Sequence, residues 1–307
     1  MRPFQFGVQY CFLKSRKELR EAVRRADDQG YAAFLTPDHF EGIDLAVGPV
    51  LAAVAQLSDR LQVGSLVYGN DFRHPLLLAR EMATLDLLSD GRALCGIGAG
   101  WYQGEYDKVG LAWDSPAKRV ARLEEAVPLI KQAWSGRTFS HSGEFYQVKD
   151  YAGIPQPVAP RLMIGGGGRR VLSLAGREAQ TVNLVTQLDL GFGTDSRKFT
   201  EDELQQKVDW VRQAAGARFT EIELSVTVFY GGVSHSPEEK LASVLDQQGY
   251  TLEQAQSSPS YLFGTRQQVL ERLRYLRQQY GISSFYLSQM GVDLESMAPI
   301  VGELAGQ

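Results

Sequence analysis

The chain has 307 residues, of which 44% are hydrophobic and 22% are charged, an ordinary composition for a globular protein. Its formal charge of −4 argues against nucleic acid or an anionic membrane as the main partner. The longest apolar run, Leu45–Ala55, is too short to span a bilayer. Two distant cysteines and the lack of a signal-peptide pattern favour a reducing, cytoplasmic compartment.

Strand and helix patterns alternate along most of the chain. The expected strands are Phe4–Gln9, Tyr31–Thr36, Leu61–Val67, Ala93–Ile97, a strand from Leu162, Thr181–Val185, Ile222–Phe229 and Ser283–Ser288. The expected helices are Lys17–Gln29, Val50–Leu57, one starting near Pro75, Val120–Ala133, Arg169–Arg177, Asp202–Ala215, Thr265–Gln279 and one from Leu294. This order predicts an α/β protein, a (β/α)8 TIM barrel of one domain over residues 1–307. On counting alone, an open doubly wound sheet is the alternative.

Two insertions interrupt the alternation. Thr138–Val148 has the composition of a β-hairpin, and residues 231–260 form the least regular long connection, a candidate lid. In a barrel of this kind the chemistry lies where the strands end, so the residues at the strand exits are the candidates for a site.

A glycine-rich segment follows the strand that begins at Leu162. Gly165, Gly166, Gly167 and Gly168 stand directly before the Arg169–Arg177 helix. Free backbone N–H groups, the positive end of the helix and a charge from Arg169 or Arg170 together favour a phosphate-binding loop. A flexible turn beside two solvated arginines is the alternative. No Lys-Ser/Thr follows, so the loop is not of the Walker type.

Asp38 and His39 follow the strand Tyr31–Thr36. A histidine at this exit is suited to donate or accept a proton near neutral pH, with Asp38 setting its tautomer or raising its pKa. The alternative is a turn-capping aspartate beside an ordinary surface histidine.

Residues 72–106 contain a helix, a turn at Ser89-Asp90-Gly91, a buried strand and the exit Gly98-Ala99-Gly100-Trp101. Since no bulky side chain precedes Trp101, a planar ligand is able to approach the backbone there. The segment resembles the luciferase-like (flavin or deazaflavin) oxidoreductase superfamily, in which an LD.LS.GR pattern precedes G.GAGW…EY. The resemblance covers most of the chain, and Ile164–Arg170 is its second specific part.

The resemblance implies a barrel like that of bacterial luciferase and a set of site residues. The exit of Leu61–Val67 would carry a bulge, often with a cis peptide near Leu66-Val67, that supports the coenzyme ring. His39 and Glu105 would be catalytic; Glu105 would otherwise hold the following helix. The residues implied to bind the coenzyme are Asp38, Leu66, Val67, Asn70, Gly100, Trp101, Gly165, Gly166, Gly167, Gly168 and Arg169.

The leading hypothesis is an oxidoreductase that transfers a hydride between coenzyme F420 and a small organic substrate, which the sequence does not specify. One alternative is a two-component monooxygenase that uses FMN and a separate flavin reductase. Another is a barrel that binds a flavin or other ligand without turnover. The resemblance also suggests a homodimer.

The remaining polar residues give weaker signals. No histidines, cysteines or acidic residues stand at metal-ligand spacing, so no metal is expected. His74 is interpreted as a helix cap more readily than as a pocket residue. His141 and the Arg122–Glu125 turn are expected to be solvated. Cys11 fits either the pocket or the core.

Overall fold

The computed structural model describes residues 1–43, 45–185, 199–236 and 252–307. Nine strands form one sheet. The short β4 (Tyr68–Gly69) follows β3 in the chain and pairs with β5. The other eight are parallel and close into a barrel, because the last of them pairs with the first. They are β1 (Gln5–Gln9), β2 (Ala33–Thr36), β3 (Gln62–Ser65), β5 (Ala93–Gly98), β8 (Arg161–Gly166), β9 (Thr181–Leu184), β10 (Glu223–Val228) and β13 (Ile282–Ser288). The closed pairing confirms the predicted barrel and removes the open-sheet alternative.

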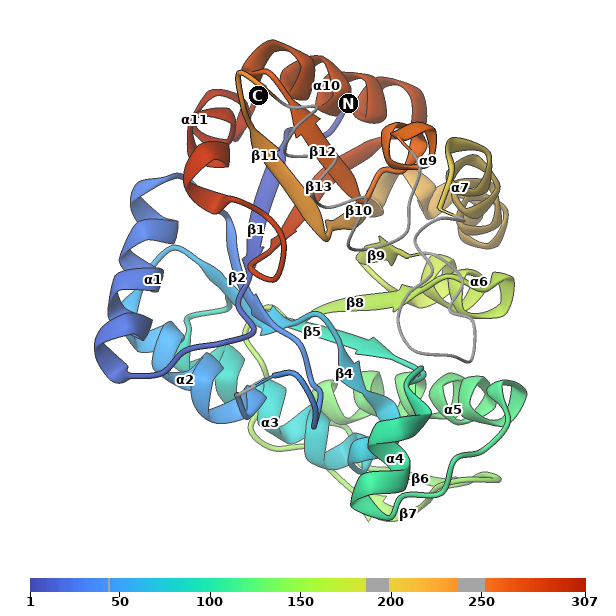
Figure 1. Cartoon of the computed structure of the whole chain (residues 1–307). Helices are drawn as coiled ribbons and strands as arrows, with labels where there is room; N and C mark the ends of the chain where they lie inside the picture. Colours follow the sequence, from blue (N-terminus) through green and yellow to red (C-terminus); the bar gives the residue numbers. More distant parts are fainter. Residues whose placement is uncertain (44, 186–198, 237–251) are drawn as a thin grey trace.

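Helices surround the barrel (Figure 1). They are α1 (Arg16–Asp28), α2 (Val47–Leu57), α3 (Pro75–Leu88), α5 (Pro116–Trp134), α6 (Arg169–Glu178), α7 (Glu201–Ala215), α10 (Arg266–Tyr280) and α11 (Leu294–Leu304). Their ends follow ordinary capping chemistry. For example, Thr265 and Gln268 form a reciprocal capping box at the start of α10, and Gly281 ends it in the left-handed conformation. The chain termini meet, since the Phe4 N–H donates to the Gln307 carbonyl over 3.0 Å.

Smaller elements lie outside the alternation of barrel strands and helices. η1 (Asn70–Phe72) follows β4, and the short helix α4 (Gln103–Val109) follows β5. The antiparallel hairpin of β6 (Phe139–Ser142) and β7 (Gln147–Tyr151) confirms the predicted hairpin. η3 (Gly216–Glu221), β11 (Tyr230–Val233), α9 (Leu252–Ser257) and β12 (Tyr261–Gly264) complete the described elements.

The core has two parts. The larger lies between the barrel and its helices and includes Phe6, Phe34 and Phe285, all fully buried. The smaller fills the barrel interior with Ala33, Leu35, Leu66, Leu94, Met163 and Tyr286. β3 and β5 approach so closely that a Cβ at Gly96 would lie 2.0 Å from the Ser65 carbonyl oxygen. Glycine is therefore required at this position.

The predicted elements and the observed ones differ in a few places. The helix expected from Val120 begins at Pro116, because Ser115 caps it. α4 and the parallel pair β11–β12 were not predicted; each is too short to show a hydrophobic period. Much of the predicted lid, residues 237–251, lies outside the described residues. No helix in the described ranges is long and apolar enough to cross a membrane.

Candidate active site

The predicted site residues follow four strands, β2, β3, β5 and β8, which are neighbours in the barrel. Parallel strands end at the same rim, so the segments that leave these strands lie along one side of the barrel mouth (Figure 1). The barrel thus brings together residues that are more than a hundred positions apart in the sequence.

His39 is held by a buried carboxylate from a different segment. Its Nδ1 lies 3.0 Å and 2.9 Å from the two carboxylate oxygens of Glu105 on α4. The Glu105 side chain is 2% exposed, whereas that of His39 is 24% exposed. Oε1 of Glu105 also accepts the backbone N–H groups of Phe40 and Glu41, at 2.9 Å and 3.2 Å. Glu105 therefore fixes both the ring and the loop that carries it.

This geometry selects a tautomer of His39. A carboxylate only accepts hydrogen bonds, so Nδ1 of His39 carries the hydrogen and Nε2 is the nitrogen that exchanges a proton. Among the described residues, Nε2 has no hydrogen-bond partner. The Trp101 ring stands edge-on to the imidazole, with 5.6 Å between ring centroids, and limits its movement. The arrangement is suited to proton transfer at the barrel mouth.

Asp38 binds the segment after β3 and not His39, and its contact with a coenzyme stays a prediction. Its two oxygens accept from Nη1 and Nη2 of Arg73 at 2.6 Å and 3.0 Å, and Oδ2 also accepts from the Gly69 N–H at 3.1 Å. The prediction that Asp38 orients His39 is wrong, because Glu105 does so. Burial alone would lower the pKa of Arg73, but the bonds and charge of Asp38 outweigh it and raise that pKa. Asp38 ties the end of β2 to the segment after β3.

The peptide bond between Leu66 and Val67 is cis, as the resemblance implied. The Leu66 carbonyl accepts from the buried Gln9 side chain over 2.9 Å. The Val67 side chain lies against two glycines: a Cβ on Gly98 or Gly165 would lie 2.9 Å or 3.1 Å from its methyl groups. Glycines on β5 and β8 thus leave room for the cis segment between β3 and β4.

Gly100 has a structural reason to be glycine. Its φ is +76°, and a Cβ there would lie 2.1 Å from the Tyr106 hydroxyl. Trp101 is half-buried and stacks on Tyr102, with ring centroids 5.4 Å apart. These contacts leave the predicted roles of Gly100 and Trp101 in framing a coenzyme ring untested.

The glycine loop after β8 has the features expected of an anion site. Gly165–Gly168 are half-buried rather than covered, Gly168 is the N-cap of α6, and no side chain caps that helix. A Cβ on Gly166 would lie 2.5 Å from the Val171 side chain, so a larger residue would distort the loop. Four glycines at the positive end of a helix fit a phosphate group.

The two arginines after this loop differ in their partners. Arg170 pairs with Glu124 of α5 and also donates to the Ala117 carbonyl over 3.1 Å. Arg169 is exposed and makes no hydrogen bond or ion pair with the described residues. Of the two guanidinium groups, that of Arg169 is the one available to an anion.

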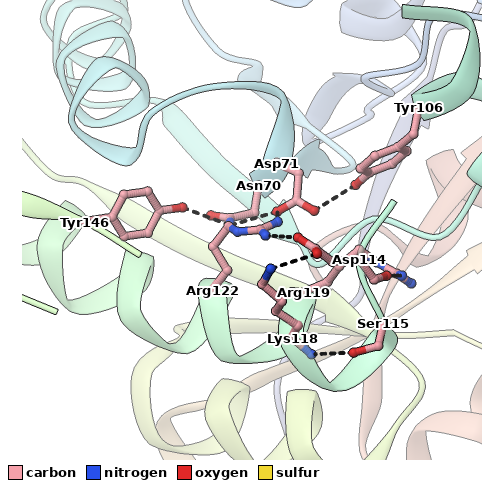
Figure 2. A network of polar contacts seen from close by, with 9 residues as sticks. All are labelled: Asn70, Asp71, Tyr106, Asp114, Ser115, Lys118, Arg119, Arg122 and Tyr146. Carbon is pink, nitrogen blue, oxygen red and sulfur yellow. Dashed lines mark hydrogen bonds and ion pairs between the residues drawn. The ribbon is translucent and has the colours of Figure 1, made fainter. Parts of the chain in front are cut away.

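A polar network behind the site joins η1, α4, α5 and the hairpin (Figure 2). Arg122 pairs with Asp71 over 2.8 Å and with Asp114, and Asp71 accepts from the Tyr106 hydroxyl over 3.2 Å. Burial raises the pKa of Tyr106, and Asp71 raises it further. Tyr106 follows Glu105 directly on α4, so the network supports the helix that orients His39.

Asn70 belongs to the same network. It is 2% exposed, and its Nδ2 donates to the Tyr146 hydroxyl over 3.3 Å. Its Oδ1 is buried without a hydrogen-bond partner in the described part of the chain. Figure 2 shows its side chain directed toward Tyr146 of the hairpin. A direct contact of Asn70 with a coenzyme stays a prediction.

Two further expectations are wrong. The Arg122–Glu125 turn is not a solvated face, since Arg122, Glu124 and Glu125 each bind another element and Leu123 is fully buried. His141 is not free either: its Nε2 lies 2.9 Å from Glu125 Oε1. Their partners stand in distant segments, so charge spacing within the turn gave no signal of them.

Two smaller questions are also settled. His74 is the N-cap of α3, where its Nδ1 accepts from the Leu76 N–H over 3.2 Å. Cys11 is fully buried and therefore belongs to the core. Burial raises the pKa of its thiol to about 11.

Residues 7–239 match the model of the luciferase-like monooxygenase family. The chain belongs to this family. The resemblance drawn from residues 72–106 and 164–170 is thereby confirmed, and the closed barrel agrees with it.

Two named relatives represent two coenzymes. An F420-dependent glucose-6-phosphate dehydrogenase of Kribbella flavida is 29% identical over 247 residues, which cover 73% of this chain and 72% of the relative. An FMNH2-dependent dimethylsulfone monooxygenase of Pseudomonas fluorescens is 28% identical over 174 residues, covering 56% and 44%. Against some other relatives with the dehydrogenase name, the chain spans about half of their length.

A solved F420-dependent secondary alcohol dehydrogenase, in complex with an F420-acetone adduct, superposes with a TM-score of 0.79. It is 18% identical to this chain, and the superposition covers 98% of both chains. This likeness establishes the shared barrel.

Proposed function

We propose that this protein is an oxidoreductase that transfers a hydride between coenzyme F420 and a small organic substrate. The observation that carries the proposal is the His39–Glu105 pair, in which a buried carboxylate leaves Nε2 as the proton-exchanging atom at the barrel mouth. The relatives named as F420-dependent dehydrogenases support the choice of coenzyme.

The residues at the mouth fit a ring that carries a phosphate. The uncapped N-terminus of α6 and Arg169 would hold the phosphate, and the cis Leu66-Val67 segment with Gly100 and Trp101 would frame the ring. When bound, the coenzyme supplies the two-electron hydride chemistry. Asp38 would act indirectly, by holding the end of β2 against the segment after β3.

The protein's own part in the reaction is the proton. With Nδ1 bound to Glu105, neutral His39 accepts a proton at Nε2 from a substrate hydroxyl, which leaves its bond to Glu105 intact. In the opposite direction, protonated His39 donates from the same atom to the oxygen of a carbonyl.

FMN is the second candidate coenzyme. The FMNH2-dependent relative supports it, and FMN offers the same combination of a tricyclic ring and a phosphate. In that case a separate flavin reductase would be the partner.

A homodimer, a cytoplasmic location and a single domain over residues 1–307 belong to the same proposal. Size-exclusion chromatography with light scattering tests the dimer.

The test is a titration of the purified protein with F420 and with FMN, followed by coenzyme fluorescence. We expect tighter binding of F420, and turnover of F420 in a screen that begins with glucose 6-phosphate and secondary alcohols. Tighter binding of FMN would move the proposal to oxygen-dependent chemistry. Tight binding without turnover would favour the non-catalytic barrel. Binding of neither coenzyme would contradict both oxidoreductase hypotheses.

Arg169 provides a sharper form of this test. We expect Arg169→Ala to weaken coenzyme binding about tenfold or more, because hydrogen bonds to charged groups contribute about 1.5–3 kcal/mol. Arg170→Ala is the matched control, since it removes a neighbouring guanidinium that already pairs with Glu124. Equal effects of the two substitutions would argue against a phosphate at this loop.

A further inference from the structure

A buried lysine lies behind the glycine loop. Lys207 of α7 is 1% exposed, and its Nζ donates to the Gly167 carbonyl and pairs with Glu203 over 3.0 Å. α7 packs against α6, the helix that follows the loop (Figure 1). Burial lowers the pKa of Lys207. Lysine is almost never fully buried unless it is paired, and the partners of Lys207 are Glu203 and the Gly167 carbonyl. The second of these partners belongs to the glycine loop.

The bond to Gly167 fixes the direction of the next N–H. The Gly167–Gly168 peptide is trans, and in a planar trans peptide the C=O and the following N–H point in opposite directions. Because Lys207 draws the Gly167 oxygen toward α7, the Gly168 N–H points away from α7. That N–H belongs to the N-cap of α6, at the helix end that carries no side-chain cap.

A glycine peptide needs such a restraint more than others do. Glycine occupies both halves of the φ range at little cost, so a run of four glycines gains many loop conformations when it is unrestrained. Rotation of the Gly167–Gly168 peptide would turn a carbonyl oxygen toward the site, where its partial negative charge would repel an anion.

We propose that Lys207 is a positioning residue for the phosphate anchor, which locks the Gly167–Gly168 peptide with its N–H toward the coenzyme phosphate and its carbonyl away from it. Lys207 itself, buried under the loop, does not contact the phosphate. The inference rests on the proposed function, because it assumes a coenzyme with a phosphate at this loop.

The test compares coenzymes with and without the phosphate. FMN is paired with riboflavin, and F420 with the deazaflavin nucleoside that lacks the phosphate and its tail. In Lys207→Met we expect the Kd of each phosphate-bearing coenzyme to rise about tenfold and the Kd of each phosphate-free form to stay within twofold. The Kd values come from fluorescence titration, which needs no substrate.

Arg218→Met is the matched control. Arg218 also donates to backbone carbonyls of α6 and its end, those of Gly176 and Ala179, but at the far end of the helix from the loop. It should lower thermal stability without changing the ratio of the two Kd values. Glu203→Gln is a second control, because it removes the other partner of Lys207 and retains the bond to Gly167.

Each outcome decides the matter. If Lys207→Met fails to fold, a milder variant, Lys207→Gln, replaces it in the same comparison. An unchanged ratio in the Lys207 variant, or an equal loss for both forms of the coenzyme, would overturn the positioning role and leave the proposed function standing. If the wild-type protein binds none of the four compounds, the proposed function itself fails.

Discussion

Two histidines of this protein are held in the same way, but only one of them lies at the barrel mouth. His39 binds Glu105, which also accepts the N–H groups of Phe40 and Glu41. His141 binds Glu125, which also accepts two neighbouring N–H groups, those of Phe145 and Tyr146. The first pair lies at the barrel mouth, whereas the second fastens the hairpin to α5. The position of the pair at the end of a strand, and not the pair alone, is what makes His39 the candidate for proton transfer.

His39→Ala should lower kcat by about 10²- to 10⁴-fold, the usual contribution of a general acid or base, and should leave the coenzyme Kd little changed. His141→Ala is the control, and its effect should fall on stability rather than on kcat. The measurements are steady-state kinetics on the substrate found by the screen and a coenzyme titration. Similar rates in the wild type and in His39→Ala would remove His39 from the mechanism.

At the scale of elements, ion pairs join helices that are distant in sequence. Glu201, in the first turn of α7, pairs with Arg272 of α10 and accepts from the hydroxyls of Tyr275 and Tyr280 at 2.8 Å and 3.0 Å. Burial alone would raise the pKa of Glu201, but Arg272 and the two hydroxyls outweigh it and lower that pKa from 4.5. The cluster holds the start of α7, the helix that carries Lys207, against α10.

The lowered pKa sets the pH dependence of this cluster. Since the pKa is lower in the folded state than in the unfolded one, the stabilisation is complete above about pH 4.5 and is lost as the pH falls through the folded value. Glu201→Gln should cost about 1–3 kcal/mol of unfolding free energy at pH 7, and this difference should shrink toward pH 3. Urea unfolding at several pH values measures the free-energy difference between the variant and the wild type and its change with pH.

Glu21→Gln is the control for this comparison, because the side chains of the Lys17–Glu21 pair on α1 are 86% and 49% exposed. Its cost should stay below about 1 kcal/mol at every pH. A Glu201→Gln cost that is the same at pH 3 as at pH 7 would show that the ion pairs of Glu201 do not stabilise the folded state.

At the scale of the whole molecule, the barrel depends on a seam between the first and the last strand. Residues of β1 and β13 pair in register, and Phe285 lies among Phe4 and Phe6 with ring centroids 6.2 Å and 6.0 Å away. Both termini meet beside this seam. Closure therefore requires contacts between residues 279 positions apart, such as Gln5 and Ser284.

Phe285→Ala should lower the unfolding free energy by about 3–5 kcal/mol, because it removes a fully buried ring from the seam. Leu77→Ala, at a position on α3 that is 63% exposed, should change it by less than about 0.5 kcal/mol. Urea denaturation followed by circular dichroism compares the two. If the two variants are equally stable, the seam does not limit the stability of the barrel.

The sequence by itself determined the elements and the family. Hydrophobic periods and turn residues lie within one helix or strand, so the eight strands and their helices were predicted to within a few residues. The glycine loop and the 72–106 segment were recognised for the same reason, since each is a contiguous pattern. Elements as short as α4 escaped prediction because a helix of two turns shows no clear period.

Only the tertiary structure decided which side chains act together. Asp38 is adjacent to His39 in sequence, yet Glu105 orients that ring and Asp38 binds Arg73. Arg169 and Arg170 look alike in sequence, and only the position of Glu124 on α5 separates them. Lys207 gave no signal, because its partner is a backbone carbonyl 40 residues away. Hydrogen bonds and ion pairs depend on distances of a few ångströms, which closure of the barrel sets and which the order of residues does not specify.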